Sequence, residues 1–198
     1  MAGRKESGQI LGNNTRIEIL DTIIDVLTIQ ETIDLVERYV KEKVPLHLIG
    51  VNADKINELH RNERLRQIVN KCGVINADGA SVLMASRILR KPLPERVAGI
   101  DLMQKLISLS ERKGYTVYLL GAKQKVVEEA AEAIKDKHPQ INIAGIHNGY
   151  FEEKDWPRIS AEIKSAEPDF VFVGITSPLK EYLVEYLQKD GNDGVFMG

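Results

Sequence analysis

Residues 169–174 read DFVFVG, with apolar side chains at four successive positions and no alternation with polar ones. A strand of this kind is buried on both faces, as in a parallel sheet that is covered by helices. Short apolar runs of the same type are LHLIGV (46–51), VIN (74–76), TVYLL (116–120) and INIAG (141–145). Stretches of helical period separate these runs, so the sequence predicts an α/β, Rossmann-like fold with a parallel sheet and helices on both faces.

The segments between the strands have the apolar spacing of helices. In the first of them, Ile56, Leu59, Leu65 and Ile68 supply the apolar positions. The expected helices cover 54–71, 80–90, 101–113, 123–137, 155–166 and 179–189. KPLPERVAGI (91–100) is a long irregular connection with two prolines and a glycine, which makes it a candidate functional loop.

The N-terminal part of the chain departs from this alternation. RIEILDTIIDVL (16–27) alternates polar and apolar residues, which predicts a small strand pair with a turn near Asp21. The T-x-x-E motif at 28–31 matches a capping box that opens a helix. Residues 1–15 are polar and contain glycine and asparagine, so we expect a disordered leader followed by a single domain over 16–198.

Composition excludes several classes of protein. The 198-residue chain carries 27 Lys and Arg against 29 Asp and Glu, a net charge of −2, which argues against a nucleic-acid-binding protein. Cys72 is the single cysteine and fits a reducing compartment. The sequence has no apolar run of about 18 residues and no signal-peptide core, so we expect a cytosolic protein. The spacing of His47, His60, His138 and His147 does not match a set of metal ligands, and we expect no metal site.

Residues that follow the strands are the candidates for chemistry, because open α/β sheets bind ligands at the carboxyl ends of their strands. Asp78, in NADGA, follows the run at 74–76. Its carboxylate could act as a general base, or it could be a turn residue or a helix N-cap. Asn52 follows the run at 46–51 and is either an Asx turn or an amide that binds a ligand. The local pattern leaves both alternatives open.

Three further residues carry the same kind of ambiguity. Arg96, in PERVAG, is restrained by the flanking prolines and Gly99, and its guanidinium suits a phosphate. The alternative is an ion pair with Glu95 or another surface carboxylate. Gly121 begins the strand-to-helix turn GAKQK, whose amides could receive a phosphate or simply form a tight turn. His147, in HNGYF, either contacts a ligand or has a structural role.

The order of these motifs resembles the bacterial WecG/TagA/CpsF family, glycosyltransferase family 26. The resemblance spans about 17–198 and consists of Asn52, DG-x-S at 78–81, PERVAG at 94–99, LLG at 119–121, HNGYF at 147–151 and Ser-Pro-x-x-Glu at 177–181. It implies transfer of a sugar, with inversion and without a required metal or a cofactor, from a UDP-sugar to a polyprenyl-diphosphate-linked acceptor. The family serves bacterial cell-surface polysaccharide synthesis, including wall teichoic acid.

The resemblance also implies roles for single residues. Asp78 corresponds to the catalytic base, Asn52 to a pocket residue near it, and Arg96 to an active-site arginine. The substrate-binding set that it implies is Asn52, Gly79, Gly121, His147, Ser177, Pro178, Lys180 and Glu181.

Two positions depart from the family pattern. Gly50 stands where the N-acetylmannosaminyltransferases have a threonine, and Lys180 replaces a glutamine expected to touch the nucleotide. The donor therefore stays open between UDP-N-acetylmannosamine, UDP-glucose and a UDP-uronic acid. The main alternative function is a non-catalytic UDP-sugar-binding partner that activates a membrane glycosyltransferase. A nicotinamide oxidoreductase is poorly supported, because the G-x-G-x-x-G motif is missing.

GVFMG (194–198) predicts the start of a buried strand, and we expect that a C-terminal segment is missing. The resemblance implies that this segment is a glycine-rich element and a basic, aromatic tail that reaches the membrane and closes over the site. The expected location is therefore peripheral, at the inner face of the bacterial cell membrane. The expected partner is a lipid-linked acceptor and not a nucleic acid. The oligomeric state stays open, a homo-oligomer included.

Overall fold

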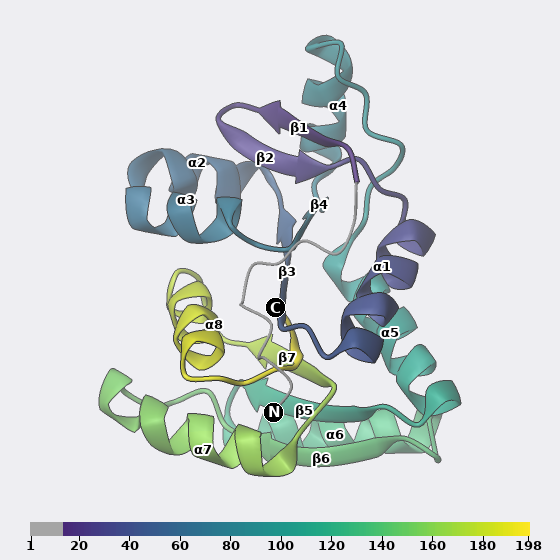
Figure 1. Cartoon of the computed structure of the whole chain (residues 1–198), viewed down its shortest axis with the longest axis vertical. Helices are drawn as coiled ribbons and strands as arrows, with labels where there is room; N and C mark the ends of the chain where they lie inside the picture. The colour runs from purple at the N-terminus through teal and green to yellow at the C-terminus, as the bar shows by residue number, and fades with distance from the viewer. Residues whose placement is uncertain (1–13) are drawn as a thin grey trace.

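The computed structural model describes residues 14–198, so most of the expected leader lies outside the described residues. The chain folds around a six-stranded sheet in the order β4-β3-β8-β7-β5-β6, with all neighbouring strands parallel (Figure 1). Its strands are β3 (Leu46–Val51), β4 (Val74–Ala77), β5 (Thr116–Gly121), β6 (Asn142–His147), β7 (Phe170–Gly174) and β8 (Val195–Met197). The predicted α/β fold with a parallel sheet is confirmed.

Helices cover both faces of the sheet. One face packs against α1 (Ile29–Glu42), α5 (Gly99–Lys113) and α6 (Gln124–Lys137). The other packs against α2 (Ala53–Arg61), α3 (Glu63–Asn70), α7 (Trp156–Ala166) and α8 (Leu179–Lys189), with a short 3₁₀ helix, η1 (Glu153–Asp155), before α7. None of the helices within residues 14–198 is long and apolar enough to cross a membrane.

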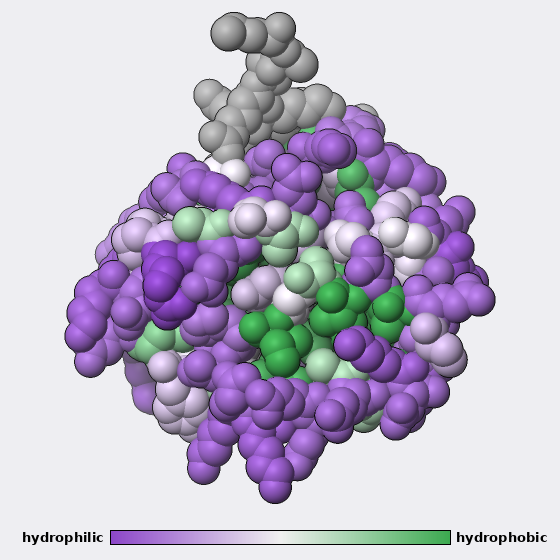
Figure 2. Space-filling view, turned by 90° about the horizontal axis from the view of Figure 1, so that it is seen from below, coloured by the Kyte–Doolittle hydropathy of each residue, from purple (hydrophilic) through white to green (hydrophobic). Residues whose placement is uncertain are grey.

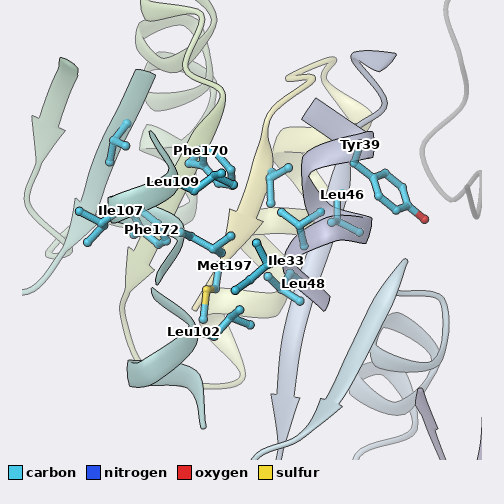
Figure 3. Close-up of a cluster of buried hydrophobic side chains, with 14 of the residues drawn as sticks. Ile33, Tyr39, Leu46, Leu48, Leu102, Ile107, Leu109, Phe170, Phe172 and Met197 are labelled. Atoms are coloured by element: carbon cyan, nitrogen blue, oxygen red, sulfur yellow. The ribbon is translucent and has the colours of Figure 1, made fainter. Parts of the chain in front are cut away.

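Burial of β7 on both faces explains its uninterrupted apolar sequence. Phe170 and Phe172 join the cluster beneath α1 and α5, while Val171 and Val173 join the cluster beneath α7 and α8. Figure 3 shows the first of these clusters, with side chains from strands and helices meeting in the same layer. It labels Ile33, Tyr39, Leu46, Leu48, Leu102, Ile107, Leu109, Phe170, Phe172 and Met197.

The strand predicted within GVFMG exists and lies in the middle of the sheet. β8 pairs with β3 on one side, Leu48 opposite Met197, and with β7 on the other, Phe172 opposite Met197. Its three residues are buried. β8 therefore joins the β4-β3 pair to the β7-β5-β6 strands.

The predicted N-terminal strand pair is also confirmed. β1 (Arg16–Ile19) and β2 (Thr22–Asp25) form an antiparallel hairpin whose turn residues, Leu20 and Asp21, have φ of 50° and 56°. Asp25 is buried and accepts hydrogen bonds from Arg16 Nε at 2.8 Å and from the Ile75 backbone N–H at 2.7 Å. The hairpin thereby closes the β4 edge of the sheet.

The opposite edge strand, β6, is more exposed. Ile143 and Ile146 are only partly buried against the core. Figure 2 looks from below at the side where β6, α6 and α7 lie, and shows hydrophobic residues in a shallow hollow ringed by hydrophilic ones. The two edges of the sheet therefore differ: a hairpin covers one, and the other faces solvent.

One predicted helix is wrong. The stretch 54–71 forms two helices, α2 and α3, because Asn62 between them adopts extended backbone angles, φ −129° and ψ 95°. The Asn62 side chain accepts a hydrogen bond from the Leu65 N–H at 3.0 Å and so caps α3. Apolar spacing continues across the break, which hides this local cap from a periodicity argument.

His47 is a buried ionisable group in β3, on the sheet face opposite α1. Burial is the main cause that lowers its pKa to about 4, and the charges of Lys180 and Lys55 act in the same direction, against those of Glu181 and Glu185. The folded protein therefore keeps this ring neutral at a pH where the unfolded chain binds a proton.

We expect stability to fall as the pH drops from about 6.5 towards 4, because only the unfolded state takes up the His47 proton in that window. Between pH 7 and pH 5 the free energy of unfolding should decrease by about 2 kcal/mol more in the parent than in a His47→Gln variant. Urea unfolding at the two pH values measures this difference. Equal losses in the two proteins would show that His47 does not contribute to the acid sensitivity.

Candidate functional site

Asp78 directly follows β4 and faces Arg96. Arg96 Nε donates a hydrogen bond to the Asp78 backbone oxygen at 2.5 Å, and its Nη2 lies 3.5 Å from Asp78 Oδ1. Glu95, the ion-pair partner considered for Arg96, instead accepts a hydrogen bond from the Ile29 N–H at 2.6 Å. Arg96 thus pairs with the candidate base itself, and both side chains remain partly exposed to solvent.

The helix after Asp78, α4 (Ala80–Ile88), is capped by the next residue in the chain. Its N-cap is Gly79, without a side-chain hydrogen bond, so the N-cap alternative for Asp78 is wrong. A Cβ at Gly79 would lie 3.1 Å from the Asn52 Cβ, which shows how closely the ends of β3 and β4 approach each other. The Asp78 carboxylate therefore remains available beside Asn52.

Asn52 has a structural role as well as a place in the site. Its Oδ1 accepts a hydrogen bond from the Lys55 backbone N–H at 2.9 Å and caps α2. This cap uses the side-chain oxygen and leaves the Nδ2 donor group for other partners. The two alternatives that the sequence left open for Asn52 are therefore compatible.

Gly121, at the end of β5, allows two strands to approach closely. It has φ +139°, and a Cβ on it would lie 2.5 Å from the backbone of Gly174 at the end of β7. The next residue, Ala122, donates its N–H to the Gly174 oxygen at 2.9 Å. The turn leads into α6, whose N-cap, Lys123, makes no side-chain cap hydrogen bond.

A charged network lies at the end of β7. Lys55 donates hydrogen bonds to Ser177 and to Glu181 Oε1, the latter at 2.8 Å, and Ser177 Oγ lies 3.0 Å from Glu181 Oε2. Glu181 is fully buried. Burial alone would raise its pKa, but the hydrogen bond and charge of Lys55, with the charge of Lys180, outweigh this and hold the pKa of Glu181 below its usual value. Glu58 Oε2 also belongs to this network, 3.4 Å from Lys55 Nζ and 3.0 Å from Ser177 Oγ. Glu181, a buried anion, and Glu58 thus position Lys55 and Ser177 together.

Lys180 is a second cation at the same place. Its side chain is 16% exposed and its Nζ lies 4.0 Å from Glu181 Oε1. Burial is the main cause that lowers the pKa of Lys180, and the neighbouring Lys55 lowers it further, while Glu181 opposes both. Two lysines thus share one buried carboxylate.

Several of these groups line one cavity of about 520 Å³ at the carboxyl ends of the strands. Its polar end includes Asn52, Lys55, Asp78, Ser177 and Lys180. Its apolar wall comes mainly from α5, α6 and the sheet, and includes Ile100, Met103, Val126, Ile134 and Phe172. Residues 14–198 contain no group of three or more His, Cys, Asp and Glu side chains arranged to hold a metal ion.

The family of the chain follows from a comparison with family models. Residues 17–198 match the model of the glycosyl transferase WecG/TagA/CpsF family. The chain belongs to this family. The polar groups of the cavity at the carboxyl ends of the strands are therefore the candidates for sugar-transfer chemistry.

Curated relatives agree with this membership. A protein of Staphylococcus aureus strain NCTC 8325, named N-acetylglucosaminyldiphosphoundecaprenol N-acetyl-beta-D-mannosaminyltransferase, is 28% identical over 188 residues, 94% of this chain and 73% of the relative. The protein of the same name in strain MRSA252 is 27% identical over the same coverage.

The structure brings together most, though not all, of the site residues predicted from sequence. Five of them line the cavity: Asn52, Asp78, Gly121, Ser177 and Lys180. Arg96, Gly79 and Glu181 contact cavity residues, and Pro178 is the N-cap of α8 beside them. His147 pairs with Leu120 in the sheet but does not line the cavity: its Nδ1 is 2.6 Å from the Asn148 oxygen, its Nε2 is 3.8 Å from Glu162, and its ring meets Phe151 edge-on. These contacts match the structural alternative for His147.

Lys55 was missed in the sequence, although it lies in the first turn of the helix that follows Asn52. The apolar wall was missed as well, because its members belong to the helical stripes of α5 and α6 and read as core. Lys55 could have been found by inspecting the whole first turn after each strand.

The glycine contact offers a test of how the site is built. We expect Gly121→Ala to lower the free energy of unfolding by at least about 2 kcal/mol, because the new Cβ meets the Gly174 backbone and the φ is unfavourable. Gly174→Ala is the matched control, since its Cβ would have no neighbour closer than 3.9 Å. Denaturant unfolding of both variants measures the effect, and equal losses would argue against the close approach of the two strands.

Proposed function

We propose that this protein is an inverting hexosyltransferase that moves a sugar from a UDP-sugar to a polyprenyl-diphosphate-linked acceptor in bacterial cell-surface polysaccharide synthesis. Asp78 carries the proposal: it is a carboxylate paired with Arg96 at the polar end of the cavity, in a chain of a glycosyltransferase family. The names of the curated relatives support the acceptor class, because they specify N-acetylglucosaminyl-diphosphoundecaprenol.

In the proposed reaction, an acceptor hydroxyl attacks the anomeric carbon of the donor sugar from the face opposite UDP. A new carbon–oxygen bond forms, the bond between the anomeric carbon and the diphosphate oxygen breaks, and the hydroxyl proton passes to the Asp78 carboxylate. The electron pair leaves with UDP, and the configuration at the anomeric carbon inverts. Asn52, beside Asp78, supplies a hydrogen-bond donor for sugar hydroxyls.

The departing diphosphate needs positive charge, and the chain provides it. Lys180 and Lys55 line the cavity, and Arg96 contributes a guanidinium next to Asp78. Groups held in place before the reaction stabilise developing charge without reorganising. We propose that these cations serve the leaving group without a required metal, and activity that persists after treatment with a chelator would support this.

The donor is proposed as UDP-N-acetylmannosamine, UDP-glucose or a UDP-uronic acid. Gly50 bears on this choice, because a Cβ there would lie 3.1 Å from the Asp78 Cβ and 3.3 Å from its Oδ2. A glycine therefore leaves room beside the proposed base that a threonine would fill. A thermal-shift screen of the three UDP-sugars would rank them, because a ligand that binds the native state raises its stability.

We expect Asp78→Asn to lower turnover at least about 100-fold, because the amide cannot accept the hydroxyl proton. Binding of UDP, measured by calorimetry, should stay within about twofold, since the change is isosteric and Arg96 can still bond the backbone oxygen of residue 78. The assay follows UDP release with a soluble short-chain acceptor. Turnover equal to that of the parent would remove Asp78 from the mechanism, and binding without any turnover in the parent itself would favour a non-catalytic UDP-sugar-binding protein.

We expect Arg96→Ala to weaken binding of UDP at least about tenfold while changing uridine binding little, because a guanidinium–phosphate contact exists only in UDP. Calorimetric titration with the two ligands separates these effects. Arg96→Lys keeps the charge and serves as the intermediate control. Equal losses for UDP and uridine in Arg96→Ala would mean that Arg96 acts by holding the end of β4.

A further inference from the structure

The outer face of α4 exposes large apolar side chains beside cations. Met84 and Ile88, one helical turn apart, are 62% and 73% exposed, and Leu89 after the helix is 46% exposed. Leu20, at the turn of the hairpin next to α4, is 54% exposed. We call this region the α4 surface; its members are Leu20, Met84, Ile88 and Leu89 with the exposed cations Arg87, Arg90 and Lys91.

The charged side chains of the segment that contains α4 are all positive. Residues 79–94 contain three cations and no Asp or Glu, in a chain whose net charge is −2. Asp78 and Glu95 flank the segment, but Asp78 pairs with Arg96 and Glu95 accepts a hydrogen bond from the Ile29 N–H. In the hairpin, Asp21 lies 3.9 Å from His60, and Glu18 offers its backbone oxygen to Lys91 Nζ at 2.9 Å. The α4 surface is therefore a cationic patch on a slightly acidic protein.

The inner face of α4 is anchored in the fold. Val82 is buried in the cluster formed with the hairpin and β4, and Ser86 is fully buried. Ser86 Oγ accepts a hydrogen bond from the Leu93 N–H at 3.2 Å, which ties the helix to the segment after it. The apolar residues of the outer face are therefore presented by a fixed helix, at the upper end of the molecule in Figure 1.

Single exposed apolar residues are ordinary, but a group of four interleaved with cations is not needed for the fold. Apolar side chains that enter the acyl boundary, flanked by Lys and Arg that meet anionic headgroups, are typical of helices that lie on a membrane. A two-fold contact with a second copy of this chain would place its three cations against these, which disfavours a symmetric dimer through this surface.

We propose that the α4 surface docks the protein on an anionic lipid surface. The inference rests on the proposed function in one respect, that the acceptor is lipid-linked. α4 begins at Gly79, next to Asp78, and a nine-residue helix is about 13 Å long. The docked helix therefore holds Asp78 at a short and fixed distance from the headgroup layer, where a diphosphate-linked sugar is carried.

Vesicle co-sedimentation of the parent chain tests this docking. The protein should bind vesicles of phosphatidylglycerol mixed with phosphatidylcholine, bind phosphatidylcholine alone weakly, and release as salt is raised. Arg87→Gln with Arg90→Gln should lower binding about 25-fold, roughly fivefold for each cation. Arg87→Lys with Arg90→Lys keeps the charge and should bind like the parent.

Met84→Asp with Ile88→Asp tests the apolar component and should lower binding at least about tenfold. Tyr150→Asp is the matched control, because Tyr150 is 72% exposed but precedes α7, at the other end of the molecule in Figure 1. Thermal unfolding checks that the variants fold. Vesicle binding that is unchanged in Arg87→Gln with Arg90→Gln and in Met84→Asp with Ile88→Asp would overturn the proposal.

Light scattering tests whether a second copy of this chain, and not a lipid surface, covers the α4 surface. A parent chain that is dimeric without lipid, becomes monomeric on Ile88→Asp and does not bind vesicles would assign the α4 surface to a second copy and overturn the proposal. Sugar transfer to a soluble acceptor tests the proposed function separately from membrane docking. The α4 variants should retain it if both proposals hold, whereas a parent that binds vesicles but transfers no sugar would refute the function alone.

Discussion

The pairing of β8 with both β3 and β7 is the interaction on which the rest of the structure depends. Asn52 and Asp78 follow β3 and β4, whereas Gly121 and Ser177 follow β5 and β7. β8 bonds the two groups of strands into one sheet, so the three residues Val195–Met197 set the distance across the cavity. Their burial among apolar neighbours from both faces explains why so short a strand suffices.

The polar end of the cavity is built from the inside outwards. Glu181, fully buried on α8, needs a cation, because an unpaired charge in such a position would be costly. Lys55 reaches it from α2, the helix capped by Asn52, and so links the ends of β3 and β7 by side chains as β8 does by backbone. Ser177 and Lys180 are then held at the same carboxylate. The proposed diphosphate site is therefore ordered by the buried anion Glu181, with Glu58 as a second carboxylate beside Lys55 and Ser177.

The sequence predicts a structural feature when that feature leaves a pattern in the order of apolar and polar residues. The run at 169–174 predicts β7, because a strand that is buried on both faces has apolar residues at successive positions. The alternation of polar and apolar residues predicts the hairpin. The helix break at Asn62 is not predicted, because the spacing of apolar residues continues across the hydrogen bond by which Asn62 caps α3 at Leu65. The central position of β8 in the sheet is not predicted either, because strands that pair across a long stretch of sequence leave no periodic pattern in that sequence.

The same distinction holds for the site. Asp78 and Asn52 are predictable from their place after strands, while Lys55 becomes a site residue through Glu181, 126 positions away. His147 follows the rule for strand ends but belongs to β6, at the edge of the sheet, where its ring packs against Phe151 and α7. Position along the chain identifies the candidates, and position within the sheet decides among them.

The segment between Asp78 and Arg96 connects the sheet, α4 and the candidate site. It leaves the sheet at Gly79, forms α4, and returns to β4, where the Val97 N–H donates to the Ala77 oxygen at 2.8 Å. This return bond is what brings Arg96 onto Asp78, so the irregular residues after α4 are fixed at their far end by the strand. The near end of the segment is also fixed, because the Asp78 N–H donates to the Val51 oxygen of β3 at 2.9 Å, so α4 projects from the site with both ends held by the sheet. A surface that orients α4 consequently orients the proposed base with it.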